Sequence, residues 1–282
     1  MRPSPDWLDA QYNNRLLVPD FARHLTQWQR DSEQARQNAG VLDLSYGSGP
    51  GETLDIFPST QANAPVLVFI HGGYWRSLDK SDHSFVAPAF VQAGACVVVV
   101  NYALCPSVTV PTIALQLVKA LVWVSRHIHH WGADPRNVHV QGHSAGGHLA
   151  AMMLACQWQQ ADPDGPAARV RTALSISGLH ELETLRHVPF LAADLRLTAA
   201  DARRCSPAWM PAPAHGQCVC VAGGDESGEF VRQAHLLQQA WGRRRVPEVA
   251  ILPGLNHFSI LGDYARAGTP LHQRALQCLG LA

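Results

Sequence analysis

The chain has 282 residues and is 47% hydrophobic, which suits one large globular domain better than two small ones. Lys plus Arg (22) equal Asp plus Glu (22), so no overall charge attracts nucleic acid or an anionic membrane surface, and we expect neither as a partner. Charged residues make up only 16% of the chain, and the resulting low-charge surface is compatible with a homodimer.

The sequence has no pattern typical of export or membrane insertion. Residues 1–17 contain no apolar segment followed by a small-residue cleavage site, and no apolar run approaches the ~18 residues of a membrane span. Seven cysteines, an odd number spread from Cys96 to Cys278, fit reduced thiols better than a disulfide framework. We therefore expect a cytoplasmic protein.

Short β-rich runs alternate along the chain with longer segments of helical periodicity. After an N-terminal helical segment (1–40), residues 41–47 and 52–58 are predicted to form an antiparallel hairpin. Further strands are expected at 66–70, 96–102, 137–142, 173–177, 217–223 and 248–252. Helices are expected at 109–129, 145–156, 229–241 and 271–279. Near-continuous hydrophobicity in the strands predicts an α/β fold, with a mostly parallel central sheet of about eight strands and helices on both faces.

One long stretch, residues 179–213, has no single clear pattern. It contains helical pieces and ends in a proline-rich run. Its length is sufficient to cover one end of the sheet as a small cap or lid. We therefore expect a single domain, 1–282, in which 179–213 is a cap insertion.

The sequence Gly142-His143-Ser144-Ala145-Gly146 lies between a predicted strand and a predicted helix. This is the G-x-S-x-G motif in the context that its chemistry requires. A strand-to-helix turn this sharp forces the central residue into a strained conformation, and the two glycines leave room for the turn. We predict that Ser144 is a catalytic nucleophile; the alternative is a tight turn with an inert serine.

A serine nucleophile requires a histidine base and an acid that orients the base. In strand–helix alternations of this kind the acid follows a late strand and the histidine follows the last one. Asp225 and His257 stand at those places, so we predict the triad Ser144, Asp225 and His257. Glu226 is the competitor for Asp225, since either carboxylate could turn toward the imidazole.

The sequence HGGYW, residues 71–75, directly follows the predicted strand 66–70. Attack by a serine puts negative charge on a carbonyl oxygen, and preorganised N–H groups must stabilise that charge. The loop in this position supplies one donor in hydrolases of this layout, and the residue after the nucleophile supplies another. Gly72, Gly73, Tyr74 and Ala145 are thus the predicted oxyanion hole. The alternative is a glycine turn with two core aromatics.

Several motifs together resemble the kynurenine formamidase (arylformamidase) family, in the hormone-sensitive-lipase-like branch of α/β-hydrolases. They are HGGYW with RSLDKSDHSF, NYALCP, GHSAGGHLAAMML, GGDESGEF, GLNHFSIL and the N-terminal YNNRLLVPDF. The resemblance implies the α/β-hydrolase fold, Ser144 as nucleophile, Asp225 and His257 as its partners, and the HGGYW loop as oxyanion donor and pocket wall. Esterases of this branch more often have a third glycine where this chain has Tyr74.

The resemblance also implies an aryl formamide substrate, N-formyl-L-kynurenine, which is split into kynurenine and formate in tryptophan degradation. The acyl group of such a substrate is only a formyl, so the pocket needs little space on the acyl side and an apolar lining for the leaving amine. The predicted lining residues are Tyr74, Trp75, His143, Trp209 and Phe230. The expected reaction passes through a formyl-enzyme and requires no metal or organic cofactor.

Two other functions stay open from the sequence. A broad carboxylesterase acting on short acyl esters would use the same triad. A non-catalytic binding protein with the hydrolase fold would usually have lost a triad residue, and none is missing here.

Overall fold

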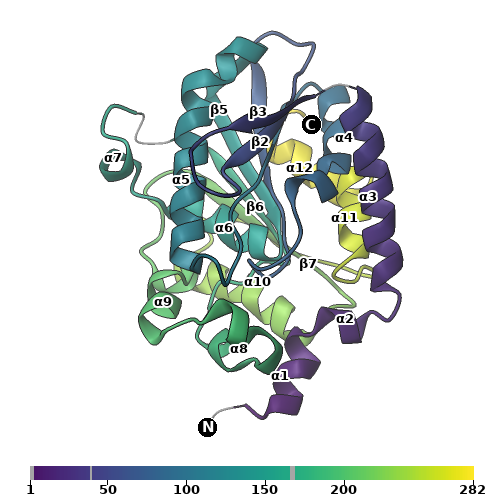
Figure 1. The fold of residues 1–282 in the computed structure, drawn as a ribbon, viewed down its shortest axis with the longest axis vertical. Coiled ribbons are helices and arrows are strands. Elements are labelled where there is room, and N and C mark those ends of the chain that lie inside the picture. Colours follow the sequence, from purple (N-terminus) through teal and green to yellow (C-terminus); the bar gives the residue numbers. More distant parts are fainter. Residues whose placement is uncertain (1–2, 39, 166–168) are drawn as a thin grey trace.

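The computed structural model describes residues 3–38, 40–165 and 169–282, and they are built around one twisted sheet (Figure 1). Within the described residues the sheet has eight strands in the order β1-β2-β4-β3-β5-β6-β7-β8. Their bounds are β1 Val41–Ser45, β2 Thr53–Phe57, β3 Ala64–Ile70, β4 Cys96–Val100, β5 Ala133–His143, β6 Thr172–Ile176, β7 Gln217–Gly223 and β8 Val249–Leu252. β1 and β2 pair antiparallel, as do β2 and β4, and every other pair is parallel. The prediction of a mostly parallel sheet of about eight strands is confirmed.

The strands read as continuous hydrophobic runs because both faces of the sheet are buried. Along β3, Val66 and Val68 pack into one hydrophobic cluster, and Leu67 and Phe69 pack into the cluster on the opposite face. All four side chains are fully buried. The alternation of a strand therefore distributes one apolar run over two cores.

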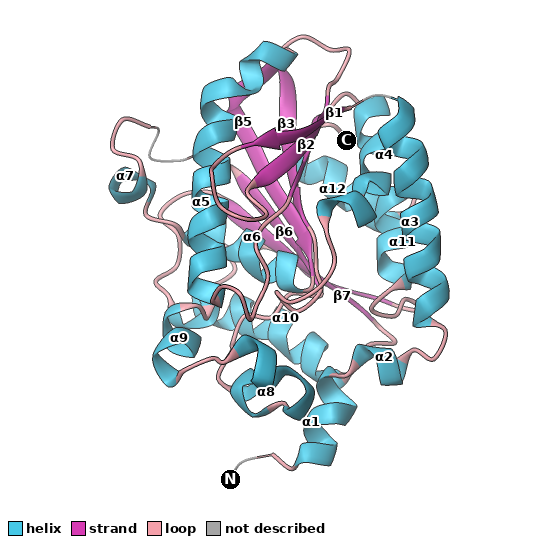
Figure 2. Ribbon diagram, in the orientation of Figure 1, coloured by secondary structure: helices cyan, strands magenta, loops and turns pink. Residues whose placement is uncertain are grey.

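Helices cover both faces, as predicted (Figure 2). α5 and α6 lie on one side of the sheet, and α3, α4, α11 and α12 lie on the other. The helices are α1 Pro5–Tyr12, α2 Asn14–Leu17, α3 Phe21–Asn38, α4 Ala87–Gln92, α5 Val110–His127, α6 Ala145–Ala155, α7 Trp158–Ala161, α8 Pro189–Leu195, α9 Ala199–Arg204, α10 Gly228–Trp241, α11 Ser259–Ala265 and α12 Pro270–Leu279. The four helices expected from periodicity correspond to α5, α6, α10 and α12.

Two helical segments far apart in the sequence meet at one end of the sheet (Figure 1). The expected cap, 179–213, contains α8, α9 and two short 3-10 helices, Thr184–His187 and Pro207–Trp209. The N-terminal segment, 1–40, contains α1, α2 and α3; its residues 1, 2 and 39 lie outside the described residues. α1 contacts both α8 and α10. These segments form the wall of the site described next.

Across the described ranges, every helix is too short or too polar to cross a bilayer.

Candidate active site

The G-x-S-x-G motif forms a sharp elbow between β5 and α6. Ser144 has φ 57° and ψ −117°, a conformation that a residue with a side chain adopts only under strain. A Cβ at Gly146 would lie 2.0 Å from the Ile70 carbonyl oxygen, and one at Gly142 would lie 2.4 Å from the Gly146 oxygen. Only glycine fits at these two positions, so the motif is explained by backbone packing against β3.

The elbow fixes the position of Ser144 over the carboxyl end of the sheet. The Ser144 N–H donates to the Ile176 carbonyl at the end of β6, over 2.8 Å. Ala145 is the first residue of α6, so its N–H lies in the first turn and has no partner within its own helix. An N–H with that placement, adjacent to the serine, can stabilise negative charge on a bound oxygen.

His257 is paired with Glu226. The Nδ1 of His257 lies 2.6 Å from Oε2 of Glu226, whose side chain is fully buried. The second oxygen of Glu226 accepts hydrogen bonds from the Ser177 hydroxyl (2.5 Å) and from the Gly223 N–H (2.7 Å). The hydroxyl and the N–H fix the carboxylate, and the carboxylate in turn fixes the orientation of the His257 imidazole.

The prediction that Asp225 is the acid partner of His257 is wrong. Asp225 is exposed, and its backbone N–H donates to the Leu255 carbonyl. The turn after β7 brings the next residue, Glu226, back over the strand end, where its carboxylate accepts from Gly223. The alternative considered from the sequence, Glu226, is the residue that the structure pairs with the histidine.

Two rings flank His257. His143 lies on one side with 4.6 Å between ring centroids, and Phe230 lies at 4.7 Å. Phe230 is fully buried and does not line the cavity, so its predicted role in the substrate pocket is corrected to packing against the imidazole. His143 does line the cavity, as predicted.

The HGGYW loop follows β3 and turns sharply beside the serine. Gly73, Tyr74 and Trp75 have φ values of 102°, 50° and 57°. A Cβ at Gly72 would lie 2.9 Å from the His143 carbonyl oxygen and 3.2 Å from Cβ of Ser144, so this glycine permits the close approach. Within the described residues, the Gly72 and Gly73 N–H groups donate no hydrogen bond to another backbone group. They are therefore available to a bound oxyanion.

The two aromatics of the loop have different positions. Tyr74 lines the cavity, and its hydroxyl donates to the Tyr12 carbonyl over 2.6 Å. Trp75 is fully buried and packs edge-on against His148 with 5.0 Å between ring centroids. Trp75 and Trp209 were both predicted to line the pocket, and neither does; Trp209 is 48% exposed on a 3-10 helix.

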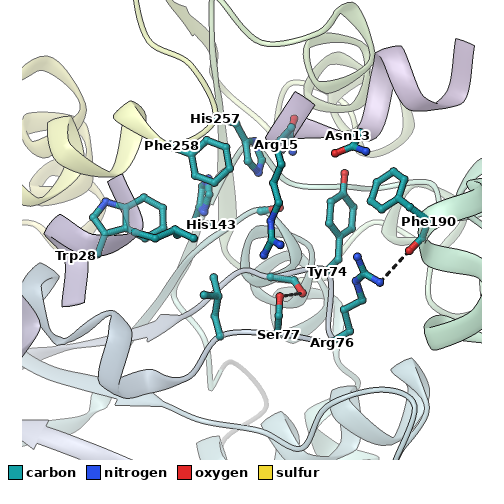
Figure 3. Close-up of a pocket in the computed structure, with 15 residues that line it drawn as sticks. Asn13, Arg15, Trp28, Tyr74, Arg76, Ser77, His143, Phe190, His257 and Phe258 are labelled. Carbon is teal, nitrogen blue, oxygen red and sulfur yellow. Dashed lines mark hydrogen bonds between the residues drawn. The ribbon is translucent and has the colours of Figure 1, made fainter. Parts of the chain in front are cut away.

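A cavity of about 230 Å³ contains Ser144 and His257 (Figure 3). Its walls come from four regions: the elbow and His257 loops, the loop 73–78, the N-terminal segment, and α8 of the expected cap, which contributes Phe190. The sequence interpretation missed the following lining residues: Asn13, Asn14, Arg15, Leu25, Trp28, Arg76, Ser77, Leu78, Phe190 and Phe258. The sequence feature that could have pointed to these residues is the polar run YNNR (12–15) directly before the apolar run LLV. Nothing in this run indicates that it lies beside Ser144, about 130 positions away.

The charges around the cavity are cationic or neutral. Among the described lining residues there is no Asp or Glu. Burial lowers the pKa of His143 well below its usual value, helped by His257 and His83, so the His143 imidazole is neutral at pH 7. Arg76 forms an ion pair with Asp194 and donates to the Phe190 carbonyl over 2.8 Å. The charge of the cavity wall therefore favours a small molecule that is apolar or anionic.

Comparisons with known proteins place the chain among hydrolases. The BD-FAE family model matches residues 54–186. The kynurenine formamidase of Danio rerio is 32% identical over 72% of this chain and 70% of that protein, and that of Salmo salar is 27% identical over 96% and 93%. A solved structure from Silicibacter sp. tm1040, provisionally described as a thioesterase, superposes with a TM-score of 0.82 at 29% identity, covering 92% of this chain and 95% of that one. Esterases are among the other relatives.

The sheet, the strained serine elbow and the buried Glu226–His257 pair define a hydrolase with the α/β-hydrolase fold. Within that class, the similarity to the Danio rerio and Salmo salar proteins assigns the family. The chain belongs to the kynurenine formamidase family.

Proposed function

We propose that this protein hydrolyses N-formyl-L-kynurenine to kynurenine and formate, in the cytoplasm and as a step of tryptophan degradation. The observation that carries the proposal is the cavity: at about 230 Å³ it is small, and Trp28, Tyr74, Phe190 and Phe258 contribute aromatic rings to its wall. A formyl group needs almost no acyl space, while an aromatic leaving group fits between rings.

The proposed reaction begins with attack by Ser144 Oγ on the formyl carbon. His257 accepts the Ser144 proton at Nε2, and Glu226 holds Nδ1 and stabilises the imidazolium that forms. The carbonyl oxygen becomes an oxyanion, which the N–H groups of Gly72 or Gly73 and of Ala145 stabilise.

The intermediate collapses when the bond from carbon to the anilide nitrogen breaks. His257 gives its proton to that nitrogen, kynurenine leaves, and the formyl group stays on Ser144 as an ester. Water, deprotonated by His257, then attacks the ester carbon. Formate leaves with the new oxygen, and the proton returns to Ser144.

Short-chain ester hydrolysis is the second candidate, since the same residues cleave esters and esterases are among the relatives. The test is kcat/KM of the purified protein on N-formyl-L-kynurenine and on phenyl acetate, with Ser144→Ala as the background control. We expect kcat/KM to be at least tenfold higher for the formamide. A preference for the ester by several orders of magnitude would overturn the proposal in favour of a carboxylesterase.

A further inference from the structure

The cavity contains one arginine that pairs with no acidic group in the described part of the chain. Arg15, the second residue of α2, extends its guanidinium into the cavity between His143 and Tyr74 (Figure 3). Its guanidinium lies over the Phe21 ring, 5.3 Å from Cζ to the ring centroid. Arg76, the other arginine of the cavity, is already neutralised by Asp194. Arg15 is therefore the cation that remains available to a ligand.

A second unused donor lies beside Arg15. Asn14 also lines the cavity; its residue is 5% exposed, and its Nδ2 has no hydrogen-bond acceptor among the described residues. Leaving a buried amide N–H without a partner costs roughly 1–3 kcal/mol. Such a group is available to an acceptor that a ligand brings into the cavity.

The chain before these two residues is held firmly. The Tyr12 hydroxyl donates to Oε1 of Glu229 over 2.8 Å, and the Ser227 hydroxyl donates to the Gln11 carbonyl over 2.6 Å. The Tyr74 hydroxyl donates to the Tyr12 carbonyl over 2.6 Å. Residues 11 and 12 are thus hydrogen-bonded both to the start of α10 and to the loop after β3, and residues 13–15 follow directly on them. The positions of Asn14 and Arg15 are set by the folded core and do not depend on a free terminus.

We propose that Arg15 and Asn14 bind the carboxylate of an amino-acid group on the leaving side of the substrate. This inference rests on the proposed function, because it names which part of N-formyl-L-kynurenine the N-terminal segment recognises. A guanidinium and an amide are both donors to a carboxylate, and the cavity lining in the described residues offers no acidic side chain to repel one. Arg15 and Asn14 are specificity-determining residues and take no part in bond breaking.

The experiment compares three substrates: N-formyl-L-kynurenine, its carboxamide, in which the carboxylate is replaced by an uncharged amide, and formanilide, which has no amino-acid group. With Arg15→Leu we expect KM for N-formyl-L-kynurenine to rise roughly tenfold at nearly unchanged kcat, a modest effect because Arg15 is solvent-exposed. For the carboxamide and for formanilide, kcat/KM should change less than about threefold. Arg15→Lys should recover part of the loss, and Asn14→Leu should raise KM for the carboxylate substrate about threefold to tenfold.

Arg23→Leu removes an exposed arginine of α3 that does not line the cavity, and it is the matched control. It should leave KM and kcat/KM unchanged for all three substrates. An equal loss of kcat/KM on formanilide in Arg15→Leu would show a structural role and overturn the inference. An unchanged KM for N-formyl-L-kynurenine would also overturn it.

Failure of the proposed function gives a different result, since the wild-type protein would then cleave none of the formamides efficiently. In that case 4-acetoxyphenylacetate and 4-methylphenyl acetate replace them as a pair of esters whose leaving groups differ in a carboxylate. Loss of the preference for the carboxylate ester in Arg15→Leu would still support the role of Arg15. A wild-type protein without that preference would refute the role.

Discussion

Two regions meet at the cavity, and they are built in different ways. The loops at the carboxyl edge of the sheet supply Ser144, Glu226, His257 and the glycines of the loop after β3, and each lies in the turn or loop that follows a strand. The N-terminal segment supplies Asn14, Arg15 and Trp28, which reach the same cavity from the other end of the sequence.

This difference in construction suits different roles: the sheet edge carries the groups that break the bond, and the N-terminal segment selects the substrate. Reacting groups at the sheet edge are placed by short loops on a rigid sheet, where positions are fixed to within fractions of an ångström. In the proposed binding mode, the N-terminal wall contacts only the part of the substrate beyond the reacting bond. Changes at the sheet edge should therefore lower the rate on every substrate, and changes in the N-terminal wall should alter the preference among substrates.

The largest expected effect is at Glu226. Glu226→Gln keeps the shape but removes the charge that stabilises the His257 imidazolium, so kcat should fall roughly 10³- to 10⁴-fold on every substrate. Asp225→Asn is the matched control, because Asp225 is the exposed neighbour, and kcat should stay within about twofold. Steady-state kinetics on N-formyl-L-kynurenine and formanilide check both values. Equal losses in the two variants would contradict the assignment of the acid.

A second prediction tests whether the elbow is fixed by backbone packing. Gly146→Ala places a Cβ 2.0 Å from the Ile70 carbonyl oxygen, so β3 or α6 must move. We expect the free energy of unfolding to fall by about 3 kcal/mol, measured by urea denaturation. Gly262→Ala in α11 is the control: its Cβ meets nothing within 4 Å, and stability should be unchanged or slightly higher. A Gly146→Ala protein with wild-type stability would contradict the packing argument.

Acid should weaken the contact between the two regions. His83 contacts Trp28 of α3 in a tilted arrangement and stacks on His71 of the loop after β3, with 5.6 and 5.5 Å between ring centroids. Burial, with a smaller contribution from His71, lowers the pKa of His83 to about 3. Its unfolded pKa is higher, near 6.5, so the unfolded state binds more protons below that pH.

The stabilisation is thus fully present above pH 6.5 and is lost as the pH falls toward 3. We expect the free energy of unfolding to decrease by about 2 kcal/mol for each such group between pH 7 and pH 5. Urea denaturation at several pH values measures it. His148, whose pKa is also lowered to about 3, should contribute in the same direction. A constant stability over this pH range would contradict the buried neutral histidines.

The smallest expected effect is at Tyr74, which joins the two regions through its bond to the Tyr12 carbonyl. Its φ of 50° allows glycine without strain. Tyr74→Gly should shift the ratio of formamide to ester kcat/KM by roughly tenfold toward esters, because it removes one wall and loosens the N-terminal segment. Tyr74→Phe, which removes only the hydroxyl, should give a smaller shift. An unchanged ratio in Tyr74→Gly would refute the role of this side chain in substrate choice.

The sheet and the serine elbow could be predicted from the sequence because both depend on local patterns. Hydrophobic runs gave the strands to within a few residues, and two glycines around Ser144 reflect contacts of the backbone with β3. Asp225 and Glu226 could not be separated, because both follow the same strand and only the direction of the turn after β7 decides which carboxylate reaches His257.

The cavity wall was less accessible to prediction. Tyr74 and Trp75 are adjacent and both have positive φ, yet only Tyr74 lines the cavity, while Trp75 enters the core beside His148. Arg15 and Trp28 line the same cavity as Ser144, more than 100 positions away in the sequence, and no local pattern encodes such proximity.

The central claim is that chemistry and substrate choice are separable, and a double-mutant cycle tests it most directly. We would measure kcat/KM of the wild type, Glu226→Gln, Arg15→Leu and the double variant on N-formyl-L-kynurenine and on formanilide. We predict that Glu226→Gln lowers kcat/KM by the same factor on both substrates. Arg15→Leu should lower kcat/KM only on N-formyl-L-kynurenine, and the two factors should multiply in the double variant. A change of the substrate ratio in Glu226→Gln, or an equal loss on both substrates in Arg15→Leu, would contradict the account.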